Sequence, residues 1–222
     1  MSSHVTYAYI RQNPDIREYI RRADMALAAI GYTEHSFAHV EKAAHTAAMI
    51  LETLEYPARQ VELAKIAGFL HDIGNVINRI DHAQSGAVMA FRILDKLGMP
   101  ADEIATVCSA IGNHDESTAF PVNAVAAALI LADKTDVRRT RVRNRDKATF
   151  DIHDRVNYAV EKASTTLDAA GKAVVLDLQL DTGMSPVIDY FEIFLERMLL
   201  CRKAAEKLGL SFRLVVNGQT VL

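Results

Sequence analysis

Histidine and aspartate side chains interrupt strongly apolar segments of this 222-residue chain. His39 lies in the middle of a predicted helix, and His71-Asp72 ends the next apolar segment, FLHDIGN. Asp133 ends a third such segment, ALILADKTD. A carboxylate on an apolar face is costly to bury unless it is paired or bound to a metal, and neutral imidazoles and carboxylates bind Mn, Fe, Zn, Co or Mg. The pattern predicts a divalent-metal site with the ligands His39, His71, Asp72 and Asp133.

Two further histidines fit a second metal ion. His82 begins the helix after the His-Asp pair, and His114 follows the end of a later helix. If Asp72 bridges, the second ion takes Asp72, His82 and His114. Two metal ions about 3.5–4 Å apart can hold a bridging hydroxide and the oxygens of a phosphoryl group. We therefore predict a hydrolase that attacks a phosphate ester with a metal-activated hydroxide, with Asp72 as the catalytic bridge and two divalent transition-metal ions per chain.

A basic run follows Asp133 directly. From residue 134 to residue 147 the sequence KTDVRRTRVRNRDK holds seven basic residues and two acidic ones. Guanidinium groups match phosphate oxygens geometrically, although such a run can equally be a solvated helix face or a set of surface ion pairs. Candidate substrate-binding residues are Arg138, Arg139 and Arg141.

The elements that must position these residues are mostly helical. Apolar residues recur with helical spacing, and Pro, Gly and Asn mark the ends; the predicted helices cover about 14–31, 34–54, 57–74, 82–97, 100–112 and 122–133. The last of them is apolar almost throughout, so we expect it to be buried on nearly all sides.

The pattern changes near the C-terminus. Residues 156–167 partly alternate, residues 173–181 alternate as a strand, residues 185–208 form a long amphipathic helix, and residues 211–216 form a last strand. The expected fold is mainly α. A helical metal-binding domain covers residues 1–145, and a small α+β appendage of antiparallel strands plus one long helix covers residues 146–222. We expect the long helix to pack on the appendage's own sheet, with a homodimer contact as a further possibility.

Composition excludes several classes of protein. Half of the residues are hydrophobic, which a packed core requires. The net charge of −3 and the lack of aromatic residues in the basic run argue against nucleic acid as the partner. Cys108 and Cys201 lie in apolar segments and are expected to be buried thiols. Without a secretory pattern or a run of about 18 apolar residues, the protein is expected to be cytoplasmic and to have no membrane partner.

The sequence segments around the predicted ligands resemble those of a known family. EHSFAHVEKAAHTAAMI, AKIAGFLHDIGN and AALILADKTD, in this order over residues 33–137, resemble the HD-domain metal-dependent phosphohydrolase superfamily. His82 in DHAQSG and His114 in GNHDE are similar to the extra ligands of its dinuclear, six-ligand branch. The resemblance implies an HD-type helical bundle, a divalent-metal centre and phosphohydrolase activity.

Departures from the sequence patterns of two branches of that superfamily narrow the range of expected substrates. Asn113 stands where cyclic-di-GMP phosphodiesterases often have histidine, and Asn75 replaces the lysine after their HDIG word. The segment HDIGNVIN lacks the Glu-Asp pair of guanosine-tetraphosphate hydrolases. The expected substrate is therefore a nucleotide or another small phosphate mono- or diester.

Three questions stay open at the level of sequence. The general base could be His35, Asp115 or Glu116. Some superfamily members with six such ligands are di-iron oxygenases, which makes oxygen chemistry the first alternative. A non-catalytic ligand-sensing or regulatory module is the second, and a purely structural metal site is disfavoured because it needs only four closed ligands.

Overall fold

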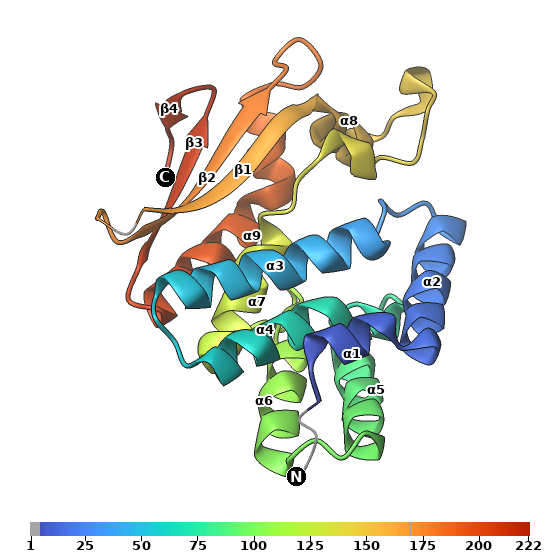
Figure 1. The fold of residues 1–222 in the computed structure, drawn as a ribbon. Coiled ribbons are helices and arrows are strands. Elements are labelled where there is room, and N and C mark those ends of the chain that lie inside the picture. Colours follow the sequence, from blue (N-terminus) through green and yellow to red (C-terminus); the bar gives the residue numbers. More distant parts are fainter. Residues whose placement is uncertain (1–4, 169) are drawn as a thin grey trace.

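The helical part of the molecule begins near the N-terminus and ends with a buried helix. The computed structural model describes residues 5–168 and 170–222, and its ribbon is drawn in Figure 1. The helices up to this point are α1 (Tyr7–Gln12), α2 (Pro14–Ala29), α3 (Phe37–Thr53), α4 (Ala58–Leu70), α5 (His82–Lys96), α6 (Ala101–Gly112) and α7 (Ala124–Lys134). The six predicted helices are confirmed, and the short helix α1 was not predicted. Helix α4 ends at Leu70 rather than near residue 74, and a separate 3-10 helix, Ile73–Val76, follows it.

Side-chain caps explain where several of these helices begin. Asn13 accepts hydrogen bonds from the backbone N–H groups of residues 15 and 16 at the start of α2, where Pro14 needs no partner. Ser36 caps α3, which therefore begins three residues after the predicted start at Glu34. Asn123 caps α7 in the same way. Each cap satisfies backbone donors that the first helical turn leaves free.

Helix α7 is the centre of the packing. Every residue from Val125 to Lys134 is buried, and α7 contacts α3, α4, α6 and α9. The prediction of a helix buried on nearly all sides is confirmed. Because Asp133 and Lys134 end this helix, their two charged side chains are buried inside the molecule rather than exposed on its surface.

The C-terminal part combines a sheet with two helices. Its elements are α8 (Ile152–Ala159), β1 (Val160–Asp168), β2 (Ala173–Leu180), α9 (Val187–Lys207), β3 (Ser211–Val216) and β4 (Gln219–Thr220). Two short 3-10 helices, Arg139–Arg141 and Lys147–Thr149, lead into it. The first residues of the predicted 156–167 strand belong instead to α8, which Asp151 caps.

The strands follow the order β1-β2-β3-β4, and their directions correct one expectation. β1 and β2 are antiparallel as predicted, but β2 and β3 are parallel. The short strand β4, which was not predicted, pairs antiparallel with β3. The reason is α9, which returns the chain to the starting end of β2 before β3 begins, as a crossover helix does.

Helix α9 lies between the sheet and the helical part (Figure 1). It contacts β2 and β3 on one side and α7 on the other, and its buried residues belong to the same core cluster as those of α3 and α7. The division at residue 145 stays a prediction. Among the described residues, none of the helices is long and apolar enough to cross a membrane.

Candidate metal centre

Five separate segments bring the six predicted ligands together. His39 comes from α3, His71-Asp72 from the end of α4, His82 from the first position of α5, His114 from the residue pair after α6, and Asp133 from α7. All six side chains are buried. Three overlapping groups of them are close enough to share a metal ion, namely His39 with His71 and Asp72, His71 with His114 and Asp133, and Asp72 with His82 and His114.

Two glycines allow the backbone segments to approach. A Cβ atom on Gly68 of α4 would lie 2.6 Å from Ala44 Cα, so α3 and α4 are in direct backbone contact beside the His39–His71 pair. A Cβ atom on Gly74 would lie 2.0 Å from the carbonyl oxygen of His82. Only glycine permits this second approach, which brings the turn after His71-Asp72 against the start of α5.

One pair of imidazoles faces two carboxylates. The Nε2 atoms of His39 and His71 are 3.3 Å apart. Asp72 Oδ2 lies 3.5 Å from His39 Nε2 and 3.2 Å from His71 Nε2. Asp133 Oδ1 lies 3.2 Å and 3.7 Å from the same two atoms. Two nitrogens and two oxygens thus converge on one point.

A second pair of imidazoles faces the other oxygen of the same carboxylate. The Nε2 atoms of His82 and His114 are 3.2 Å apart. Asp72 Oδ1 lies 3.6 Å from His82 Nε2 and 3.9 Å from His114 Nε2. Asp72 therefore directs one oxygen to each histidine pair, which is the geometry of a bridging carboxylate.

The hydrogen bonds of the histidines test whether a metal ion fits. The Nδ1 groups of His71, His82 and His114 donate to backbone carbonyls at 2.8, 3.0 and 2.6 Å. A carbonyl only accepts, so each of these rings carries a proton on Nδ1 and turns Nε2 towards the centre. Two facing Nε2 lone pairs would repel, so a proton or a metal ion must lie between them. Asp72 Oδ2 is also buried without a hydrogen-bond partner among the described residues, so the donor set fits divalent metal ions.

The fourth histidine is oriented by a residue that the sequence analysis missed. His39 Nδ1 donates to Asp136 Oδ2 at 2.8 Å, and Asp136 is fully buried. Its carboxylate also accepts from Lys42 at 2.8 Å and from Arg138 at 2.7 Å. The segment DKTD could have pointed to Asp136, because it places a second aspartate one turn after Asp133 at the end of the same apolar helix. Asp136 is not itself one of the predicted ligands.

Electrostatics within the centre favour a cation beside the first pair. Burial alone lowers the pKa of His71, but the carboxylates of Asp72 and Asp133 outweigh it and raise the pKa to about 10. Burial and the nearby His71 lower the pKa of His114 to about 3. His114 is therefore neutral at neutral pH, the state in which imidazole binds metal.

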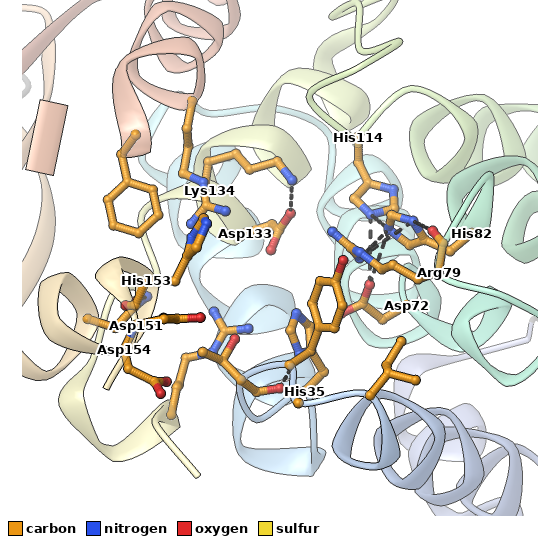
Figure 2. A pocket seen from close by; sticks show the side chains of 18 residues that line it. His35, Asp72, Arg79, His82, His114, Asp133, Lys134, Asp151, His153 and Asp154 are labelled. Carbon is orange, nitrogen blue, oxygen red and sulfur yellow. Dashed lines mark hydrogen bonds and ion pairs between the residues drawn. The ribbon is translucent and has the colours of Figure 1, made fainter. Parts of the chain in front are cut away.

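The centre opens into a cavity of about 430 Å³. In Figure 2, Asp72, His82, His114 and Arg79 lie on one side of it, Asp151, His153 and Asp154 lie on the opposite side, and Lys134 is between them. Phe194 and Arg197 of α9 complete the wall. Pockets of this size accommodate small-molecule ligands.

The three candidate arginines are placed differently. Arg141 lines the cavity and donates to the carbonyl oxygens of Glu34 and Asp136, each at 2.8 Å. Arg138 is paired with Asp136, and Arg139 donates to the carbonyl oxygen of Tyr158 at 3.0 Å. Among the described residues that line the cavity, Arg141 is thus the only member of the predicted trio. Arg79, Lys134 and Arg197 are cations of the cavity that the sequence analysis did not select.

Comparisons with known proteins give distant relatives. The chain is 24% identical over 179 residues to an uncharacterized protein of Methanocaldococcus jannaschii, a match that covers 70% of this chain and 69% of the relative. The crystal structure of a predicted HD superfamily hydrolase from an uncultured Thermotogales bacterium is 23% identical, covers 59% of this chain and 73% of its own, and has a TM-score of 0.43.

A family match decides the classification. The sequence model described as HD domain matches residues 36–159, which is more than half of the chain. This range includes all six predicted ligands, and the resemblance inferred from the sequence is confirmed. The chain belongs to the HD domain family.

Proposed function

We propose that this chain is a metal-dependent phosphohydrolase that cleaves a small phosphate ester, a nucleotide or a related mono- or diester. The observation that carries the proposal is the position of Asp72 between two pairs of histidines, with one carboxylate oxygen 3.2–3.5 Å from one pair and the other 3.6–3.9 Å from the second. One ion would be held by His39, His71, Asp72 and Asp133, and the other by Asp72, His82 and His114.

The charge of the centre supports an anionic substrate. When bound, two divalent ions would activate water and stabilise the charge of a phosphoryl group. Their charge exceeds that of the two carboxylates that hold them. Arg79, Lys134 and Arg141 add further positive charge around the cavity. A phosphate group would neutralise this excess, whereas a neutral substrate would leave it uncompensated.

The opposite side of the cavity supports a polar organic group on that phosphate. Asp151 and Asp154 lie there, across the cavity from Asp72, His82 and His114 (Figure 2). Each has one carboxylate oxygen engaged within the chain, Asp151 by the N–H of residue 154 and Asp154 by Asn144. The remaining acceptors suit hydroxyl or amino groups, such as those of a sugar or a nucleobase.

The three candidate bases differ in their surroundings. Glu116 is paired with Lys134 and Arg197, which outweigh its burial and hold its pKa below the ordinary value. Asp115 accepts from Ser117 and lies 3.7 Å from Arg79. His35 lines the cavity and donates its Nδ1 proton to the carbonyl of residue 33, so its Nε2 accepts. Of the three, only His35 lines the cavity among the described residues, while burial and the nearby Arg141 lower its pKa and so weaken it as a base.

The test is turnover by protein reconstituted with Mn, Fe, Co, Zn or Mg on a panel of phosphomonoesters and phosphodiesters. We expect cleavage by the wild type and loss of both metal and activity in Asp72→Asn. Asp177→Asn, on the solvent side of β2, is the matched control and should behave as wild type. A metal-loaded wild type that cleaves nothing in the panel would refute the proposal.

A second function is favoured by the nitrogen-rich ligand set. Four imidazoles around one bridging carboxylate also suit iron, so a di-iron oxygenase is the alternative reaction on the same centre. Oxygen uptake by the iron-loaded protein with a polyol or phosphonate, without phosphate release from any ester, would support the oxygenase. Tight metal binding with neither reaction would support a ligand-sensing module.

A further inference from the structure

Helix α9 contributes two residues to the wall of the metal cavity. Phe194 and Arg197 line it together with the predicted ligands. Helix α9 covers Val187–Lys207, so both residues lie outside the segment 36–159 that matches the HD domain family. Whatever these residues do is therefore a property of this chain's own C-terminal part rather than of the matched domain.

A chain of alternating charges connects α9 to the metal centre. Arg197 Nε donates to Glu116 Oε1 at 2.7 Å. Glu116 Oε2 lies 3.2 Å from Lys134 Nζ, which lies 2.7 Å from Asp133 Oδ2. Arg197 is thus three ion pairs away from a predicted metal ligand, and Glu116 fixes the direction of its guanidinium group.

The guanidinium group of Arg197 retains capacity for a ligand. Only its Nε is hydrogen-bonded within the described part of the chain. Its side chain keeps 25% of its surface exposed, although the residue lines an interior cavity. Phe194 covers one face of the guanidinium, with Cζ 4.6 Å from the ring centroid. The two Nη groups remain as a pair of parallel donors, the arrangement that binds phosphate oxygens.

The charge balance leaves this group of residues in need of an anion. Lys134 and Arg197 share the carboxylate of Glu116. Asp133 directs Oδ1 to the histidines and Oδ2 to Lys134, so a metal ion bound at Oδ1 would share its charge with Lys134. Glu116 and Asp133 would then neutralise Lys134 and Arg197 only in part beside the cavity. An ion pair that served only to anchor α9 would require no second cation and no open cavity next to it.

We propose that Arg197, held by Glu116 and assisted by Lys134, binds the phosphoryl oxygens that the metal ions do not bind, so that the C-terminal part completes the active site. This inference rests on the proposed phosphohydrolase function and extends it to a residue outside the matched domain. It also implies that the helical part alone is not a competent enzyme.

The test is the affinity of the metal-reconstituted full-length protein for inorganic phosphate, measured by calorimetry. Arg197→Gln removes the charge, and Arg197→Lys keeps the charge but loses the paired donors. Arg202→Gln is the matched control, because Arg202 is on the same helix, is 48% exposed and pairs only with Glu206 among the described residues. Metal content and melting temperature are measured for every variant.

We expect Arg197→Gln to weaken phosphate binding by about 10–100-fold, the usual range for lost hydrogen bonds to a charged group. Arg197→Lys should fall between Arg197→Gln and the wild type, and Arg202→Gln should lie within about twofold of the wild type. Metal content should be the same in all four proteins. With an ester substrate, Arg197→Gln should raise KM more than it lowers kcat.

Two results would overturn the inference in distinguishable ways. If Arg197→Gln keeps its metal and binds phosphate within about twofold of the wild type, while the wild type turns over an ester, the phosphate role of Arg197 is wrong and the proposed function stands. If the metal-loaded wild type neither binds phosphate nor cleaves an ester, both proposals fail. Should Arg197→Gln not fold, Arg197→Lys with unchanged phosphate affinity gives the first of these results.

Discussion

Asp136 offers the sharpest test of how the metal centre is held. Asp136 is not a predicted metal ligand, but its Oδ2 accepts a hydrogen bond from His39 Nδ1 at 2.8 Å. On the other oxygen it receives Lys42 at 2.8 Å and Arg138 at 2.7 Å. Its negative charge balances these cations in a fully buried position. The perturbation we choose is Asp136→Asn, which keeps the shape of the side chain and removes the charge.

The magnitude follows from the donors that surround the carboxylate. An asparagine has one accepting oxygen and one donating NH₂ group. Whichever way it is oriented, the NH₂ faces a donor, either His39 on one side or Lys42 and Arg138 on the other. Breaking a buried ion pair from one side costs about 3–5 kcal/mol. For a chain of this length that is roughly 6–20 °C in Tm, at about 2–4 °C per kcal/mol.

Metal affinity should fall as well. A carboxylate that holds a metal-binding histidine raises the basicity of the ring and fixes its orientation, and loss of such a partner costs about 10–100-fold in affinity. The assay is competition with a chelator of known affinity, followed by elemental analysis, with Tm recorded on the same samples. Asp177→Asn serves as the surface control. Wild-type metal affinity in a folded Asp136→Asn protein would show that Asp136 does not position His39.

Three further predictions concern the centre and the thiols. His114→Ala should lose one of two metal ions and retain the other; two ions per chain in this variant would contradict the assignment of separate histidine pairs. Gly74→Ala should lose about 1–3 kcal/mol or more of stability together with metal, because its Cβ would lie 2.0 Å from the His82 carbonyl oxygen; native Tm and metal content would contradict this. Cys201 is buried as expected, whereas Cys108 is only half-buried. Partial burial still raises the pKa of the Cys108 thiol to about 11, so the thiolate forms only as pH rises towards that value. Alkylation of Cys108 at pH 8 should then be about 100-fold slower in the native than in the denatured chain, and equal rates would contradict the raised pKa.

Local sequence signals were enough to predict the helices α2 to α7 and α9, but not the short helices α1 and α8. The Asn13-Pro14 pair indicates where α2 begins, and the apolar composition of residues 122–133 indicates that α7 is buried. Both signals can be read locally, because caps and periodicity act within a few residues. Strand direction is different in kind. The parallel pairing of β2 with β3 depends on how α9 crosses between strands that are far apart in sequence, and neither strand's own residues carry that information.

The same distinction separates the ligands from their partners. His39, His71-Asp72 and Asp133 could be selected because polar groups in apolar segments are costly to bury without a partner. Asp136 was missed because its contact with His39 spans 97 residues. Arg197 was missed because its contact with Glu116 spans 81 residues and its helix reads as ordinary amphipathic packing. Two of the three arginines selected for their local charge have partners away from the cavity.

The sequence by itself determined the helical body, the identity of the six candidate ligands and the family resemblance, because each depends on residue types and short-range spacing. Only the tertiary structure decided that Asp72 directs one oxygen to each histidine pair. It also decided that Asp136 accepts a hydrogen bond from His39 and that Arg197 lines the cavity. Those facts depend on the directions of side chains from separate helices, which are set by close backbone contacts at Gly68 and Gly74 and by the packing of α9 on α7.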